Sequence, residues 1–149
     1  MKNASGLAQL VLRLALGAGF LLPVMDRMGV MGPYGANGVT WGDWQHFVDY
    51  THTLVPFANR LVANILSVLA TIGEFVFGIC LIIGFRIKEA ALGAGLLTLG
   101  FGLCMAIFVS ISTPFSYPVF VFTGSALVLS GIGHYNWSID DFLRNREQN

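Results

Sequence analysis

Charged side chains are scarce in this chain. Lys, Arg, Asp and Glu make up 11% of its 149 residues, whereas soluble globular domains average about 25%. The formal net charge is zero, and the few basic residues lie at the ends of apolar segments. The sequence therefore lacks the basic surface that nucleic-acid binding requires, which excludes that class of partner.

Cysteine is also scarce, because the chain has only Cys80 and Cys104. At a rise of 1.5 Å per residue, the two thiols are expected about 6 Å and about 24 Å from the same membrane surface, on different spans. A disulfide needs Cα atoms within about 7 Å of each other. No Cys-x-x-Cys pair is present either, so the sequence gives no support for a thiol oxidoreductase.

Apolar residues are the largest group in the sequence. They make up 55% of the chain, and the mean hydropathy is +0.71, which is typical of a membrane protein. At roughly 20 residues per span, the apolar segments predict an all-α bundle of four transmembrane helices in a single domain, residues 1–149. The predicted spans are residues 6–25, 59–84, 89–112 and 116–137. The first resembles a signal peptide, but Arg13 would interrupt the apolar region of one, so we expect this span to stay attached.

The only long connection between predicted spans, residues 26–58, has two parts with different sequence patterns. It opens with a glycine-rich stretch that punctuates a helix rather than propagates it. From Thr40, a candidate N-cap, to Val55, apolar residues recur at helical spacing opposite a polar face. The segment is too short and too polar to span a membrane. We predict an amphipathic helix in the headgroup region, with Trp41 and Trp44 at the interface.

The placement of basic residues predicts the orientation of the chain. Five of them flank the predicted spans on one side: Lys2, Arg86, Lys88, Arg144 and Arg146. Arg27 and Arg60 lie on the other side. Because cytoplasmic flanks carry the excess of Lys and Arg, we expect a multi-pass membrane protein with both termini in the cytoplasm. The long connection would then face outward, which in a bacterium is the periplasm.

Two charged residues, Arg13 and Glu74, lie in the middle of predicted spans. A charge at the centre of a membrane helix costs about 2.5–3.5 kcal/mol, so such residues usually face the protein interior and have a partner. At 1.5 Å per residue they lie about 10 Å and about 15 Å from the inner ends of their spans. We predict that they pair and form a polar core, which serves either a functional site or the structure alone.

Other polar residues are predicted to line the same core as candidates for binding a cofactor. Thr98 and Ser130 are expected at the depth of the pair. The full set within the spans is Asn64, Thr71, Thr98, Thr123 and Ser130. The cofactor is left open at this point, with a quinone as one candidate.

The connection between spans one and two supplies a second group of candidates: Trp41, Trp44 and His46. The tryptophans, or Tyr50, would stack on a quinone or lipid headgroup, and a histidine would donate to a carbonyl. The alternative is that the aromatic residues only anchor the chain at the membrane surface. His46, Asp49 and His52 are suitable metal-ligand types, but a spacing of three drifts around a helix. A solvated polar face is favoured, and no metal site is predicted.

Short motifs run through the first three spans: Arg13-x-x-x-Gly17-x-x-Phe20, Glu74-x-x-x-Gly78 and Gly84-Phe85-Arg86-x-Lys88 followed by Ala90-Ala91. With the glycine-rich loop and the proline before span two, their order and spacing resemble the DoxX family. The resemblance implies a four-helix bacterial membrane protein akin to the small subunit of thiosulfate:quinone oxidoreductase, with Arg13 and Glu74 as shared positions. The chain departs from that family after span one, where Leu22-Pro23 and Arg27 replace its usual residues.

The sequence thus predicts an accessory subunit of a membrane redox system linked to quinones or sulfur compounds, with a redox partner protein and the lipid bilayer as its contacts. One alternative is a scaffold or assembly factor without catalytic activity. Another is a small-solute carrier, which would need to form a homo-oligomer. A cavity between the spans that touches Glu74 and opens toward Trp41 or Trp44 would favour the redox or carrier hypothesis, whereas a solid core would favour the scaffold.

Overall fold

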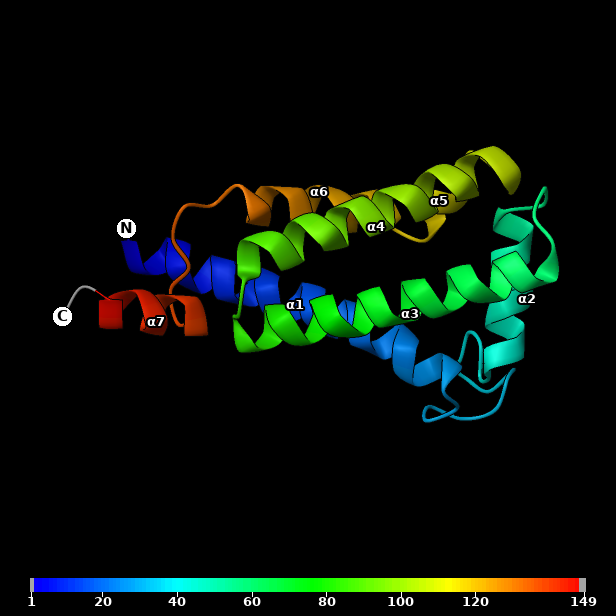
Figure 1. Ribbon diagram of the computed structural model, residues 1–149, viewed down its shortest axis with the longest axis horizontal. Coiled ribbons are helices and arrows are strands. Elements are labelled where there is room, and N and C mark those ends of the chain that lie inside the picture. The colour runs from blue at the N-terminus through cyan, green and yellow to red at the C-terminus, as the bar shows by residue number, and fades with distance from the viewer. Residues whose placement is uncertain (1, 148–149) are drawn as a thin grey trace.

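The computed structural model describes residues 2–147, with the side chains of residues 6–146, and this part of the chain forms seven helices and no strand. The helices are α1 (Lys2–Arg27), α2 (Trp44–Leu54), α3 (Arg60–Ile83), α4 (Ile87–Phe108), α5 (Thr113–Ser116), α6 (Val119–Ser130) and α7 (Ile139–Glu147). Figure 1 shows the long helices lying along one axis, with α7 and the start of α1 at one end and α2 across the other. We refer to these as the α7 end and the α2 end.

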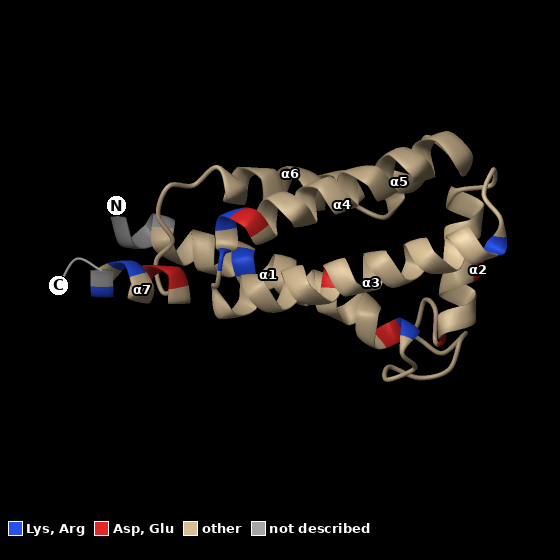
Figure 2. Cartoon of the chain, viewed as in Figure 1, with Lys and Arg blue, Asp and Glu red and all other residues tan. Residues whose placement is uncertain are grey.

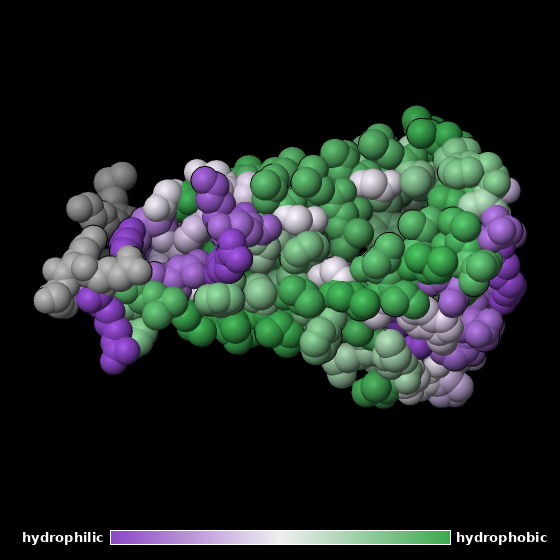
Figure 3. All heavy atoms as spheres, viewed as in Figure 1, coloured by the Kyte–Doolittle hydropathy of each residue, from purple (hydrophilic) through white to green (hydrophobic). Residues whose placement is uncertain are grey.

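Three helices are long and apolar enough to cross a membrane. They are Gly6–Arg27 within α1, α3 and α4, with 22, 24 and 22 residues. At 1.5 Å per residue they extend about 33–36 Å, slightly more than the hydrocarbon thickness of about 30 Å. Hydrophobic side chains cover the middle of the molecule, and hydrophilic ones gather at its two ends (Figure 3). The surface therefore suits a protein embedded in a bilayer.

The predicted fourth span, residues 116–137, is not confirmed as a full-length helix. The short helix α5 is followed by a break at Tyr117 and Pro118, and α6 has only 12 residues, or about 18 Å. The break has a physical cause, because Pro118 has no backbone N–H to donate to the preceding turn. Gly131 then ends α6. The fourth apolar segment is therefore a broken helix.

The amphipathic helix of the connection is present but begins later than predicted. Its N-cap is Asp43 rather than Thr40, and Oδ1 of Asp43 accepts the N–H of His46 at 3.0 Å. Trp41 therefore lies before the helix, whereas Trp44 lies within it. The helix crosses the bundle at the α2 end and packs mainly on α3 (Figure 1).

Helices α1 and α3 approach each other closely at Gly17 and Gly78. A Cβ atom on Gly17 would lie 2.6 Å from the Ile82 side chain and 3.0 Å from the carbonyl oxygen of Gly78. Only a residue without a side chain fits there, as is typical of helices that pack in lipid. This contact fixes the register of the two antiparallel helices. Helix α4 packs mainly on α6.

The segment between α6 and α7 is tied to the other helices at the α7 end. Gln9 donates to the carbonyl oxygen of His134 at 2.9 Å and accepts the N–H of Asn136 at 3.1 Å. The carboxylate of Asp140 accepts the N–H groups of Arg86 and Ile87, each at 2.8 Å. Helix α4 has no side-chain cap of its own at Arg86, so Asp140 caps it from another part of the chain.

Candidate functional site

Glu74 pairs with Arg27 at the C-terminal end of α1. Nη2 of Arg27 lies 2.6 Å from Oε2 of Glu74, and the two side chains are 2% and 11% exposed. The other nitrogens of Arg27 also have partners, because Nε donates to the carbonyl oxygen of Pro23 at 3.0 Å and Nη1 to Oγ1 of Thr71 at 2.8 Å. The ring of Phe47 covers the guanidinium at 3.6 Å. Arg27 therefore links α1, α2 and α3.

The predicted pairing of Arg13 with Glu74 is wrong. Arg13 is buried at the α7 end, where Nη2 donates to the carbonyl oxygen of Trp137 at 2.8 Å. The register of α1 and α3 explains the separation. With Gly17 beside Gly78, Arg13 lies four residues from this contact toward one end of the bundle, and Glu74 lies four residues from it toward the other. At 1.5 Å per residue the two are about 12 Å apart along the bundle.

Asp26, the neighbour of Arg27, holds the glycine-rich loop against the helices. Its Oδ2 accepts the N–H groups of Thr40 at 2.9 Å and Trp41 at 3.1 Å, and its Oδ1 accepts that of Gly42 at 3.0 Å. A buried carboxylate with three backbone donors is well stabilised. These bonds fix the position of Trp41 beside the ion pair.

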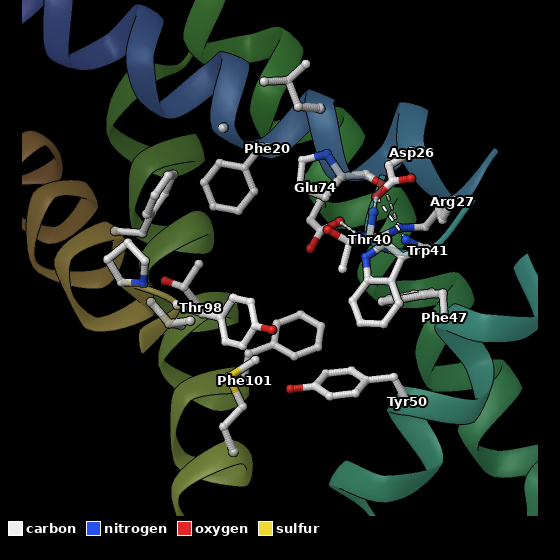
Figure 4. Close-up of a pocket in the computed structure, with 18 of the residues that line it drawn as sticks. Phe20, Asp26, Arg27, Thr40, Trp41, Phe47, Tyr50, Glu74, Thr98 and Phe101 are labelled. Atoms are coloured by element: carbon white, nitrogen blue, oxygen red, sulfur yellow. Dashed lines mark hydrogen bonds and ion pairs between the residues drawn. The ribbon is translucent and has the colours of Figure 1, made fainter. Parts of the chain in front are cut away.

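A cavity of about 490 Å³ lies beside the ion pair, toward the α2 end. Three residues predicted as site candidates line it: Glu74, Thr98 and Trp41. Figure 4 shows side chains from α1, α2, α4 and the α5–α6 segment converging on this space. Leu22 and Tyr117 line the cavity and are also exposed, so the cavity is open between α1 and the break before α6.

The walls of the cavity are mostly aromatic and aliphatic. The ring centroid of Trp41 lies 4.9 Å from that of Tyr50 and 5.5 Å from that of Phe47. Phe20 and Phe122 meet edge to face on the opposite side, with centroids 6.3 Å apart. These rings leave flat surfaces on which a planar molecule can stack.

The hydroxyl of Tyr50 is buried without a hydrogen-bond partner in the described part of the chain. Figure 4 shows this side chain reaching from α2 toward the cavity. Burial raises the pKa of Tyr50, and the nearby Tyr117 adds to the rise. The group therefore stays protonated and able to donate.

No protein-family model, curated protein or solved structure matches the chain. The resemblance to the DoxX family therefore stays a prediction. What the chain can do chemically rests on the geometry of the cavity and its ion pair.

Thr98 and Thr123 come together between α4 and α6, with their Oγ1 atoms 2.9 Å apart. Only Thr98 lines the cavity, and its hydroxyl also donates to the carbonyl oxygen of Ala94 at 3.0 Å. Ser130, predicted at the same depth, instead donates to the carbonyl oxygen of Leu127 in its own helix. The predicted polar layer therefore contains Thr123 in place of Ser130.

The other candidates do not line the cavity. Thr71 lies behind Arg27, and Asn64 accepts the indole N–H of Trp44 at 2.9 Å. His46 stacks on Tyr34, with ring centroids 3.8 Å apart, and its Nδ1 lies 2.8 Å from the Asp43 carboxylate. Asp49 pairs with Arg60, and Nε2 of His52 lies 3.0 Å from the carbonyl oxygen of Ala58. Each of these residues has a neighbour of its own outside the cavity.

Sequence reasoning missed Arg27 and Asp26. Both follow directly after the predicted first span, residues 6–25, where charged residues commonly mark the end of a membrane helix. One signal was available: Glu74 needed a cation, and Arg27 was the other arginine of the same segment. The side chain of Arg27 turns back along α1, as its bond to the carbonyl of Pro23 shows, and so reaches a carboxylate that lies deeper.

Proposed function

We propose that this chain is a DoxX-like accessory subunit of a membrane redox system and that its cavity binds a molecule of the quinone class. The observation that carries the proposal is the cavity itself, which touches Glu74 and Trp41. Its volume of about 490 Å³ falls within the range of small-molecule sites, about 300–1,000 Å³.

The chemistry of the walls favours a planar ring with an apolar tail. The ring would stack on Trp41 and lie near the Arg27–Glu74 pair, where polar substituents find partners. The tail would leave between Leu22 and Tyr117, which are 49% and 58% exposed. A ligand that lives in the bilayer can enter by this route without passing through water.

The broken helix is proposed as the fourth crossing of the membrane. Backbone without helical hydrogen bonds is tolerated at membrane depth where it lines a cavity, and Tyr117 and Pro118 do so. Charged residues gather toward the two ends of the bundle (Figure 2). Arg86, Lys88, Arg144 and Arg146 belong to the α7 end, which we assign to the cytoplasmic side of a bacterial inner membrane.

The scaffold and carrier hypotheses make different demands on the core. A scaffold with a purely structural ion pair needs no free space beside that pair, so the cavity counts against it. A carrier needs a path to both ends of the bundle. At the α7 end the core is filled by buried residues such as Leu81, Ile87 and Leu129, all 0% exposed, which disfavours such a path through one copy of the chain.

The test is equilibrium binding of ubiquinone-1 to the protein in lipid nanodiscs, measured by calorimetry. Trp41 lines the cavity and Trp44 does not, so these two residues offer a matched comparison. We expect Trp41→Leu to weaken binding about threefold to tenfold, because stacking is worth about 0.5–1.5 kcal/mol, whereas Trp44→Leu leaves the affinity unchanged. No binding of either ubiquinone-1 or its reduced form to the unaltered protein, or equal losses in both variants, would contradict the proposal.

A second measurement addresses the native ligand and the redox partner. Native mass spectrometry of the protein purified from its own membrane is expected to show a retained molecule with the mass of a quinone or quinol. Retention of phospholipid alone would contradict the assignment of the cavity.

A further inference from the structure

The polar groups that face the cavity differ in how many hydrogen-bonding positions they have free for a ligand. Arg27 supplies the charge that makes the site polar, but its side chain is only 2% exposed. Each of its three nitrogens already has a partner, namely Pro23, Thr71 and Glu74. A ligand in the cavity therefore meets little of the guanidinium.

Asp26 and Thr98 are committed in the same way. The two carboxylate oxygens of Asp26 accept three backbone N–H groups. The hydroxyl of Thr98 donates to the carbonyl oxygen of Ala94 and accepts from Thr123. Thr98 therefore has no donor left for a ligand, and three of the about four acceptor sites of the Asp26 carboxylate are occupied.

Glu74 differs from these residues. Its side chain is 11% exposed, and Oε2 is closed off beside Arg27. Oε2 is the oxygen that Arg27 holds, whereas no described residue donates a hydrogen bond to Oε1, which is not closed off. A carboxylate paired with an arginine can only accept. Glu74 therefore offers the cavity an acceptor without a donor.

The remaining polar side-chain groups on the cavity walls are the hydroxyls of Thr40, Tyr50 and Tyr117 and the indole N–H of Trp41. A hydroxyl can donate or accept, and the indole N–H can donate to a carbonyl oxygen or to a hydroxyl oxygen. These residues therefore do not discriminate between ligands that carry donors and ligands that carry only acceptors. The uncommitted carboxylate oxygen does discriminate. A ring oxygen that cannot donate would face it with repulsion, whereas an O–H group would form a charge-assisted hydrogen bond.

We infer that the cavity is selective for the reduced, hydroxyl-bearing form of its ligand, the quinol, with one ring O–H donating to Oε1 of Glu74. The inference rests on the proposed function and adds the redox state of the ligand. Glu74 becomes a specificity-determining residue, and no electron transfer by this chain is required.

Three ligands of nearly the same shape test the inference on the unaltered protein in nanodiscs, under anaerobic conditions. They are ubiquinol-1, ubiquinone-1 and the dimethyl ether of ubiquinol-1, which keeps the aromatic ring but has no O–H group. We expect the quinol to bind about tenfold more tightly than either of the others, since an unpaired buried acceptor costs about 1–3 kcal/mol. Equal affinities, or tighter binding of the quinone, would overturn the inference while leaving the proposed function in place. Failure of all three to bind would overturn both.

The variant Glu74→Gln gives an independent readout. Its amide offers both an acceptor and a donor, so we expect the ratio of quinol to quinone affinity to fall to about one. If Glu74 has a purely structural role, Glu74→Gln will bind the quinol and the quinone more weakly by the same factor, and the ratio of their affinities will not change. That result would overturn the inference. If this variant does not fold, the ligand series on the unaltered protein decides the question alone.

Discussion

Nη2 of Arg27 and Oε2 of Glu74 lie 2.6 Å apart, and this contact joins two helices at the floor of the cavity. The ring of Phe47 stacks on the guanidinium from α2 at 3.6 Å. The guanidinium is thus shielded from water and lipid, whereas the carboxylate faces the cavity. The pair holds together the three helices that define one side of the cavity.

Removing one member of this pair is expected to destabilise the protein strongly. In Arg27→Met the Glu74 carboxylate stays buried without its cation, which typically costs about 3–5 kcal/mol. Unfolding in detergent by denaturant measures the change in free energy. The double variant Arg27→Met, Glu74→Leu removes both charges and is expected to recover most of the loss.

The matched control for this prediction is the pair of Arg60 and Asp49, whose side chains are 59% and 54% exposed. Exposed pairs contribute about 0–1 kcal/mol. Arg60→Met is therefore expected to change the free energy of unfolding by less than about 1 kcal/mol. Similar losses in the free energy of unfolding in Arg27→Met and Arg60→Met would contradict the prediction, because burial of the Arg27–Glu74 pair would then make no difference to its contribution.

Asp26 is expected to control the order of the loop before α2. In Asp26→Ala the N–H groups of Thr40, Trp41 and Gly42 lose their acceptor, and each such loss costs about 1–3 kcal/mol in a buried setting. We expect amide hydrogen exchange at these three residues to become at least about tenfold faster, as measured by mass spectrometry. Asp49→Ala, at an exposed site, should leave exchange in this loop unchanged.

Substitutions at Gly42 and Gly38 allow the cost of backbone strain to be separated from the cost of steric overlap. Both have a positive φ, +67° and +79°, but a Cβ on Gly42 would lie 2.2 Å from the backbone nitrogen of Tyr34, whereas one on Gly38 would meet nothing within 4 Å. A positive φ costs about 1–2 kcal/mol for an ordinary residue, and an overlap adds about 1–3 kcal/mol.

Gly42→Ala is therefore expected to lower the free energy of unfolding more than Gly38→Ala does. The thermal unfolding midpoint of each variant in the same detergent measures the difference. Equal midpoints would mean that the loop shifts to relieve the overlap at no cost.

The N-terminus of α2 is expected to loosen in acid. Its cap, the carboxylate of Asp43, accepts the N–H of His46, and this bond lowers the pKa of Asp43. The ionised cap therefore stabilises the helix above the ordinary pKa of an aspartate, about 4, and the stabilisation is lost as the pH falls through the lowered value. Exchange of the first α2 amides, corrected for intrinsic rates, should speed up between pH 5 and pH 3.

Asp43→Asn provides the control for the acid effect, because asparagine also caps helices but does not titrate in this range. Corrected exchange in this variant should be the same at pH 5 and pH 3. A pH dependence that persists in Asp43→Asn would assign the effect to another group.

The sequence was sufficient to locate three apolar helices and to single out Glu74, because a carboxylate in an apolar segment has few possible roles. It placed Trp41 and Thr98 among the site residues, and both line the cavity. The partner of Glu74 could not be obtained by counting residues from the ends of the spans. The contact of Gly17 with Gly78 sets the offset between α1 and α3, and that offset depends on packing in three dimensions.

The fourth apolar segment illustrates a second limit of sequence patterns. Hydropathy continues across Tyr117 and Pro118, so a window of 20 residues cannot detect the break between α5 and α6. The proline was visible, but its effect depended on its position within the segment. The tilted helix α2 and the loop held by Asp26 are likewise set by contacts between residues far apart in the chain.

The cap that Asp140 supplies to α4 has a consequence for synthesis. The N–H groups of Arg86 and Ile87 bond to a carboxylate that lies 54 and 53 residues later in the chain. During translation, the whole of α4, which ends at Phe108, is therefore synthesised before Asp140 is added. The first turn of α4 therefore lacks its capping carboxylate until Asp140 has been synthesised. Capping of α4 has to follow the synthesis of α5, α6 and the start of α7.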